Sequence, residues 1–158
     1  MSAVVLLGLL GCPGRSSAVD SALTDPLTLA AEASLREATN RLREERDQPP
    51  LAGLPLADRQ ARLHSRAMAS GRTQLGHSGF SGRVDAISEV VLVIRAGENV
   101  TTNIGYEDPV DQALSDWLQS DEHSANLLDD WTHTGVGVAR SDEGAWWFTQ
   151  TFIATTVD

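Results

Sequence analysis

Two histidines and one glutamate, His77, Glu98 and His123, are the side chains of this sequence best suited to chemistry. Glu98 lies in the segment AGENV (residues 96–100), and His123 lies in the run SDEHSANLL (residues 120–128). Two imidazoles and one carboxylate are the components of a divalent-metal site or of an acid/base site. Because His77 and Glu98 stand 21 positions apart, no single helix or hairpin can join them. The site is therefore a prediction about the whole tertiary fold.

Two helices are predicted before this group of residues. Asp25 followed by Pro26 is a typical helix start, and apolar residues at three- and four-residue spacing extend that helix to about Asp47. A second helix fits residues 57–70, with Gly71 as its C-terminal stop.

The helices nearer to the site are shorter. Residues 71–88 are rich in loop formers and include a helical turn near 82–87. A third clear helix begins at Asp108, with Pro109 at its first helical position, and ends near Ser120. Ser120 is itself the predicted cap of a short fourth helix that carries residues 123–128.

Strands are predicted just before Glu98 and at the end of the chain. The β-branched run 90–94 predicts a short strand that leads into Glu98. Two more strands, 135–140 and 145–153, are joined by a hairpin signal at 141–144. The last strand carries Trp146, Phe148 and Phe152 on one face and Trp147 on the other, so both faces of the sheet should be covered. The expected fold class is α+β, a three-layer α-β-α sandwich with a central antiparallel sheet.

Size and charge exclude several classes of function. The chain has 158 residues, the usual length of one domain, and its 12 basic residues, all arginine, face 22 acidic residues for a formal charge of −10. Nucleic-acid binding depends on basic residues that neutralise phosphates, so we expect no nucleic-acid partner. The same acidic balance argues against adsorption to an anionic membrane surface.

The first 12 residues form an apolar leader that is too short to span a bilayer. The leader ends in Leu9-Leu10-Gly11-Cys12, which resembles a bacterial lipobox with Cys12 as the acylated residue. It lacks the basic start of a signal peptide, so either Met1 is not the true start or the export signal is weak. We expect an exported protein, extracellular or in the cell envelope, that contacts membrane only through a lipid anchor at Cys12. Residues 13–24 are predicted to be a flexible tether, and residues 25–158 the folded domain.

A series of short motifs runs from about Leu29 to Phe152. In chain order they are Asn40-x-x-Arg43, Pro55-Leu56, Ala67-Met68-Ala69, His77, Gly97-Glu98-Asn99-Val100, Trp117-x-x-Ser120, His123-x-x-Asn126-Leu-Leu, Gly135-Val-Gly-Val138 and Trp147-x-x-Gln150-x-Phe152. Each motif is weak alone, but in this order they resemble the CAP superfamily (cysteine-rich secretory proteins, antigen 5 and pathogenesis-related 1). The resemblance is strongest to the bacterial SCP-like extracellular domains, and it implies their α-β-α sandwich.

The resemblance also implies a site. Members of the family place two histidines and one or two glutamates in a central cleft, where several of them bind zinc or another divalent ion. His77, Glu98 and His123 are the matching positions in this sequence. Ser120 stands where the eukaryotic proteins have a second acidic residue, so it would line the cleft without adding an anionic ligand. The cysteine-rich appendages of the animal members are absent from this sequence.

Two functions are compatible with such a cleft. The first is a monomeric, exported binding module whose cleft holds a divalent ion, a small apolar or lipid-like molecule, or a segment of a protein partner. The alternative is a metal-dependent hydrolase of peptide or ester bonds, with His77 and His123 as ligands and Glu98 as a ligand or the general base. Glu98 also has a structural interpretation, as an acceptor that holds its loop through backbone N–H bonds. The sequence leaves open whether the protein is an enzyme.

Other polar residues near the motifs have structural interpretations. Asn99 and Asn126 are expected to orient neighbouring loops through local hydrogen bonds. Gln150, on a central strand, is expected to face a helix layer and to support a motif loop. His64 and His133 match no motif, and we interpret both as surface or structural residues.

Overall fold

Proline begins each of the three longest helices. Pro26, Pro55 and Pro109 occupy first helical positions, where a backbone N–H has no partner within the helix. Asp25 and Asp108 cap two of these helices, because their carboxylates accept hydrogen bonds from backbone N–H groups of the first turn. The helix starts predicted at these two aspartates are confirmed.

The computed structural model describes residues 25–156. Its elements are, in chain order, α2 (Pro26–Glu44), β1 (Ala52–Gly53), α3 (Pro55–Ala69), α4 (Phe80–Ser88), β2 (Val93–Asn103), α5 (Pro109–Leu118), α6 (Asp121–Leu128), β3 (His133–Arg140) and β4 (Trp146–Thr155). The predicted leader 1–12, the tether 13–24 and the lipidation of Cys12 lie outside the described residues. None of the helices in residues 25–156 has the length and apolarity needed to cross a membrane.

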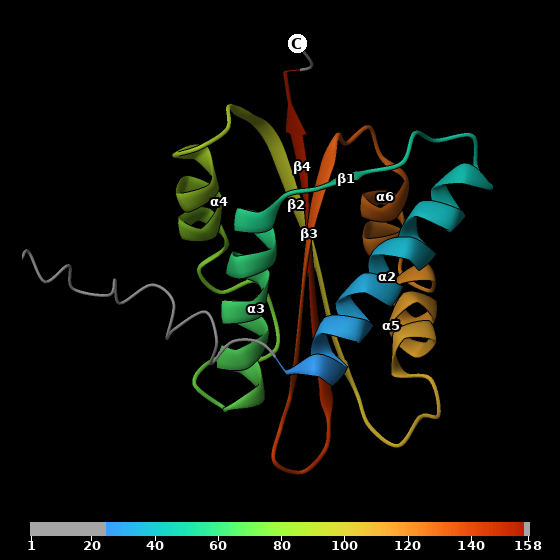
Figure 1. Cartoon of the computed structure of the whole chain (residues 1–158), viewed down its shortest axis with the longest axis vertical. Coiled ribbons are helices and arrows are strands. Elements are labelled where there is room, and N and C mark those ends of the chain that lie inside the picture. Colours follow the sequence, from blue (N-terminus) through green and yellow to red (C-terminus); the bar gives the residue numbers. More distant parts are fainter. Residues whose placement is uncertain (1–24, 157–158) are drawn as a thin grey trace, which may run out of the picture.

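The strands form one sheet with helices on both of its faces (Figure 1). Their order is β1-β3-β4-β2, in which β2 and β3 both run antiparallel to β4. In Figure 1, α3 and α4 cover one face of the sheet, and α2, α5 and α6 cover the other. The predicted α-β-α sandwich is confirmed. The sheet is mixed rather than purely antiparallel, because the two-residue strand β1, which the sequence did not predict, runs parallel to β3.

The strand that carries Glu98 starts later and is much longer than predicted. The run 90–94 predicts a strand that ends before Glu98, whereas β2 begins at Val93 and contains Glu98 near its middle. Val90 and Leu92 are 63% and 67% exposed and lie in the turn after α4, so their β-branched or apolar character does not reflect burial in the sheet. Pairing with β4 over the full length of β2 determines the strand instead.

Helix α2 also ends earlier than predicted. Its last helical residue is Glu44, and residues 45–47 form a turn in which Asp47 adopts a positive φ of 57°. The early end precedes Pro49 and Pro50, which the sequence indicated as the stop.

Two glycines allow α3 to lie directly against β3. A Cβ atom at Gly135 would stand 2.3 Å from the carbonyl carbon of Ala57, and one at Gly137 would stand 2.0 Å from the backbone nitrogen of Arg62. No side chain fits at either position without moving the helix. The Gly-Val-Gly-Val motif therefore sets the distance between this helix and the sheet.

Beyond β1, side-chain carboxylates occupy the position beside β3 that a further strand would take. Asp58 accepts a hydrogen bond from the backbone N–H of Val136 at 2.8 Å, and Glu32 accepts one from that of Val138 at 3.1 Å. Arg36 pairs with Asp58, and Arg62 pairs with Glu32. Burial raises the pKa of Glu32 above its ordinary value, although Arg62 opposes this effect.

Candidate functional site

Glu98 is the centre of the site. It lies in β2, and its side chain is only 1% exposed. Its Oε1 accepts a hydrogen bond from Nδ1 of His77 at 3.0 Å, so the structure brings together two of the three residues singled out in the sequence. A buried carboxylate requires such partners, because removal from water otherwise disfavours its charge.

Arg83 is the principal partner of Glu98, and the sequence did not indicate it. Its Nη2 donates to Oε1 and Oε2 of Glu98 at 2.7 and 2.9 Å, and its Nε donates to Oε2 at 3.0 Å. Its Nη1 donates to the carbonyl of Ser78 at 2.7 Å, which ties the start of α4 to the loop of His77. The available signal was its position six residues after His77, on the helical turn predicted at 82–87.

Another histidine, on α3, holds the loop that carries His77. His64 is buried on α3, and its Nε2 lies 2.7 Å from the carbonyl oxygen of Gly76. Burial lowers the pKa of His64, although the Gly76 carbonyl favours the protonated form. His64 is thus structural, in agreement with one of its two predicted interpretations, while His77 itself is 49% exposed.

An amide network joins β2 to α6 on the other face of the sheet. Asn99 Nδ2 donates to the carbonyl of His123 at 2.9 Å, and Asn126 Nδ2 donates to Oδ1 of Asn99 at 2.9 Å. Trp131 Nε1 donates to the carbonyl of Asn126 at 2.8 Å. Gly97 leaves the space for this packing, because an added Cβ would stand 3.0 Å from Oδ1 of Asn126. Both asparagines orient neighbouring segments, as predicted.

His123 stands in the first turn of α6 and is partly buried. Ser120 is the helix cap, since its Oγ accepts a hydrogen bond from the backbone N–H of His123 at 3.5 Å. Burial lowers the pKa of His123, the charge of His77 lowers it further, and Glu122 opposes both effects. His77 precedes α4 and His123 lies on α6, and these two helices contact the edge strand β2 from opposite faces of the sheet.

These residues do not fit the predicted three-ligand zinc site in this arrangement. Both oxygens of Glu98 accept hydrogen bonds from Arg83, which supplies the positive charge that a metal would otherwise provide. Within residues 25–156, no group of three His, Cys, Asp or Glu residues is placed to hold a metal ion. The same pairing leaves Glu98 poorly suited to act as a general base, because the base must release an oxygen to accept a proton.

Gln150 supports a helix and not a motif loop. It is fully buried on β4, where its Oε1 accepts a hydrogen bond from Thr39 of α2 and its Nε2 donates to Thr134 of β3. It does face a helix layer, as predicted. The predicted partner is wrong: Gln150 bonds to the buried hydroxyl of Thr39 on α2 and not to a motif loop.

The groups that remain available for chemistry are the exposed imidazole of His77, the partly buried imidazole of His123 and the hydroxyl of Ser120. Neutral imidazoles can both donate and accept hydrogen bonds. The surrounding network of Arg83, Asn99 and Asn126 holds them on fixed elements. Such an arrangement can recognise polar groups.

The model of the cysteine-rich secretory protein family (CAP) matches residues 36–152. No curated protein matches the sequence. An outer surface protein of Borrelia burgdorferi has a similar structure, with a TM-score of 0.69 and 17% identity over 82% of this chain and 96% of that one. An extracellular protein with an SCP domain from Bacillus anthracis has a TM-score of 0.69 and 26% identity, over 84% of this chain and 44% of that one. A cysteine-rich secretory protein of Staphylococcus aureus has a TM-score of 0.66 and 20% identity, over 84% of this chain and 41% of that one. The chain thus spans less than half of the last two proteins.

Proposed function

This chain belongs to the cysteine-rich secretory protein (CAP) family, and we propose that it is an exported binding module that recognises a segment of a protein partner through His77 and His123. The observation that carries the proposal is the pairing of Arg83 with both oxygens of Glu98. It leaves the carboxylate a structural support, so the groups that remain for recognition are the two imidazoles and Ser120.

Two structurally similar proteins support export. The Bacillus anthracis protein is described as extracellular and the Borrelia burgdorferi protein as an outer surface protein. We propose the same side of the membrane for this chain, with Cys12 as a lipid attachment point. Mass spectrometry of the membrane fraction should find diacylglycerol on Cys12, and a full-length soluble protein with a free thiol would contradict the anchor.

The polar character of the site favours a peptide segment over an apolar or lipid-like molecule. Imidazole nitrogens and a serine hydroxyl lose their hydration on binding, and this loss is compensated only by a ligand with hydrogen-bonding groups. Extended peptide segments offer a backbone donor and acceptor at every residue other than proline.

Peptide display on the full chain tests this function. Peptides selected on the wild type alone should bind it at least about tenfold more tightly than they bind a His77→Ala/His123→Ala double variant in calorimetry. His133→Ala is the matched control, because it removes an imidazole at the start of β3, outside the site. Peptides that bind the double variant and the wild type equally would contradict the proposed site.

A parallel assay with ester and peptide substrates addresses the hydrolase alternative. If Glu98 were a general base, Glu98→Gln would lower the rate by about 10²–10⁴-fold while the fold survived. We expect no activity that depends on Glu98, because Arg83 holds its oxygens. Such an activity, lost in Glu98→Gln, would replace the binding function with the catalytic one.

A further inference from the structure

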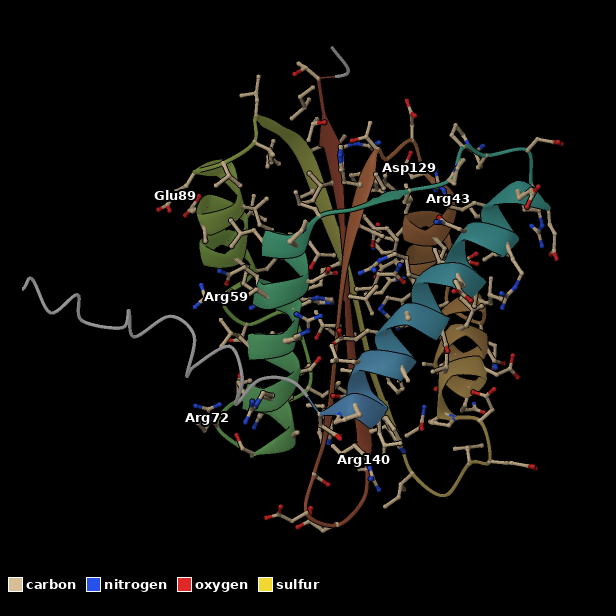
Figure 2. All side chains as sticks on the ribbon, in the orientation of Figure 1. Arg43, Arg59, Arg72, Glu89, Asp129 and Arg140 are labelled. Carbon is tan, nitrogen blue, oxygen red and sulfur yellow. The ribbon has the colours of Figure 1, made fainter. Side chains whose placement is uncertain are left out.

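Basic charge is concentrated in one stretch of this acidic chain. Residues 59–84 contain five of the 12 arginines and none of the 22 acidic residues, so the stretch carries a formal +5 within a chain of −10. It covers most of α3, the following loop and the start of α4, which share one face of the sheet in Figure 1. Figure 2 shows Arg59 and Arg72 on the side of this layer that faces away from α2.

A pocket of about 400 Å³ lies in this basic region, between α3, the loop after it and α4. Its polar lining consists of Gln60, His64, Arg72, Thr73, Ser78 and Arg83, and no carboxylate residue lines it. The volume is in the range of small-molecule sites. A concave surface lined by one sign of charge attracts ions of the opposite sign, even on a protein whose net charge is unfavourable.

The two arginines of the pocket have different tasks. Arg83 is already neutralised by Glu98, and its bond to the carbonyl of Ser78 fixes one wall of the pocket. Arg72 is exposed, and its Nε donates to the neutral hydroxyl of Ser70 at 3.0 Å. Within residues 25–156 no carboxylate pairs with Arg72, so its positive charge and its outer N–H donors remain available to a ligand.

His64 does not compete for this role. It lines the pocket, but its Nε2 is engaged with the carbonyl of Gly76, and burial favours its neutral form. Thr73 and Ser78 also line the pocket, and each carries a hydroxyl that can act as a neutral hydrogen-bond donor. A guanidinium fork with adjacent hydroxyls is the donor set that matches a phosphate group in charge and geometry.

We propose that this pocket is a phosphate-binding site in which Arg72 supplies the charge and Thr73 and Ser78 supply neutral donors. Neither His77, His123 nor Glu98 lines it, so the proposal does not depend on the proposed recognition of a protein segment. The phosphate is either a free phosphate or monoester, or the diester of a larger envelope molecule.

The test is a titration of the full chain, followed by the backbone amide resonances of residues 72–78. Inorganic phosphate is added at constant ionic strength by exchange for chloride, and the shifts should be local and saturable. Arg72→Gln should weaken binding by about tenfold or more, because it removes the charge-assisted contact. Arg46→Gln is the matched control, since it makes the same charge change at an exposed turn after α2 and should leave binding unchanged.

A second titration with dimethyl phosphate identifies the kind of phosphate. Tighter binding of inorganic phosphate indicates a free phosphate or monoester, and equal or tighter binding of the diester indicates a diester ligand. The proposal is overturned if the shifts do not saturate, if chloride alone produces them, or if Arg72→Gln and Arg46→Gln bind phosphate equally well.

Discussion

Replacement of Arg83 by methionine should strongly destabilise the protein. The variant leaves the carboxylate of Glu98 buried, with its side chain 1% exposed, and removes three of the contacts to its oxygens. His77 remains as a partner, but it is half exposed and provides one hydrogen bond. Leaving one member of a buried ion pair without its partner typically costs about 3–5 kcal/mol. Because a domain of this size has about 5–15 kcal/mol of stability in total, the variant should be only marginally folded.

Two further variants separate this effect from a general loss of charge. Arg41→Met is the control, because the pair that Arg41 forms with Glu37 is long and exposed and should contribute less than about 1 kcal/mol. The double variant Arg83→Met/Glu98→Gln removes both charges, and it should recover much of the stability lost in Arg83→Met.

Urea unfolding at neutral pH, followed by tryptophan fluorescence and far-ultraviolet circular dichroism, measures these free energies. A loss of less than about 1 kcal/mol in Arg83→Met, equal to that of Arg41→Met, would refute the reasoning. It would mean that Arg83 does not hold Glu98 in solution, which would leave the carboxylate available to bind a metal or to act as a base.

Three shorter predictions concern packing, pH and metal. Gly137→Ala should destabilise the protein by about 3 kcal/mol or more in urea unfolding, since its Cβ would overlap the backbone of α3. Gly82→Ala, which has open space at its Cβ, is the control and should be neutral or stabilising by up to about 1 kcal/mol. Because burial lowers the pKa of His64, its imidazole is protonated at a higher pH in the unfolded chain than in the folded one, and the free energy of unfolding should fall as the pH drops below about 6.5. His64→Gln should reduce the dependence of this free energy on pH between about pH 7 and 5.5. Calorimetry should detect no zinc binding in the micromolar range, because Arg83 holds Glu98; such binding, if lost in both His77→Ala and His123→Ala, would contradict this arrangement.

The parts of the fold that follow from local sequence signals were predictable. Capping aspartates followed by prolines marked two helix starts, and the Ser-Asp-Glu-Gly turn marked the final hairpin. The position of β2 was not predictable in this way. Its long pairing with β4 is a tertiary interaction, and the apolar run before it, residues 90–92, lies in an exposed turn.

The same distinction applies to the site. The motifs around His77 and Glu98 identified a contact that the structure contains, but not the arginine that dominates it. An arginine has no local signal that tells a buried ion pair from a solvated side chain, because the difference lies in what packs over it. Arg43 of the Asn40-x-x-Arg43 motif is a second buried arginine whose partners are distant in the sequence. Its Nη1 donates to the carbonyls of Leu127 and Asp129, and Figure 2 shows Arg43 near Asp129.

The carboxylates beside β3 have a consequence for self-association. Exposed strand edges allow sheets from different molecules to join, and natural proteins block them. On β3, Asp58 and Glu32 occupy N–H groups that an incoming strand would need, and the packing of α3 on Gly135 and Gly137 obstructs its approach. A strand from a second molecule therefore cannot pair along the edge of β3, and this margin of the sheet is closed to self-association.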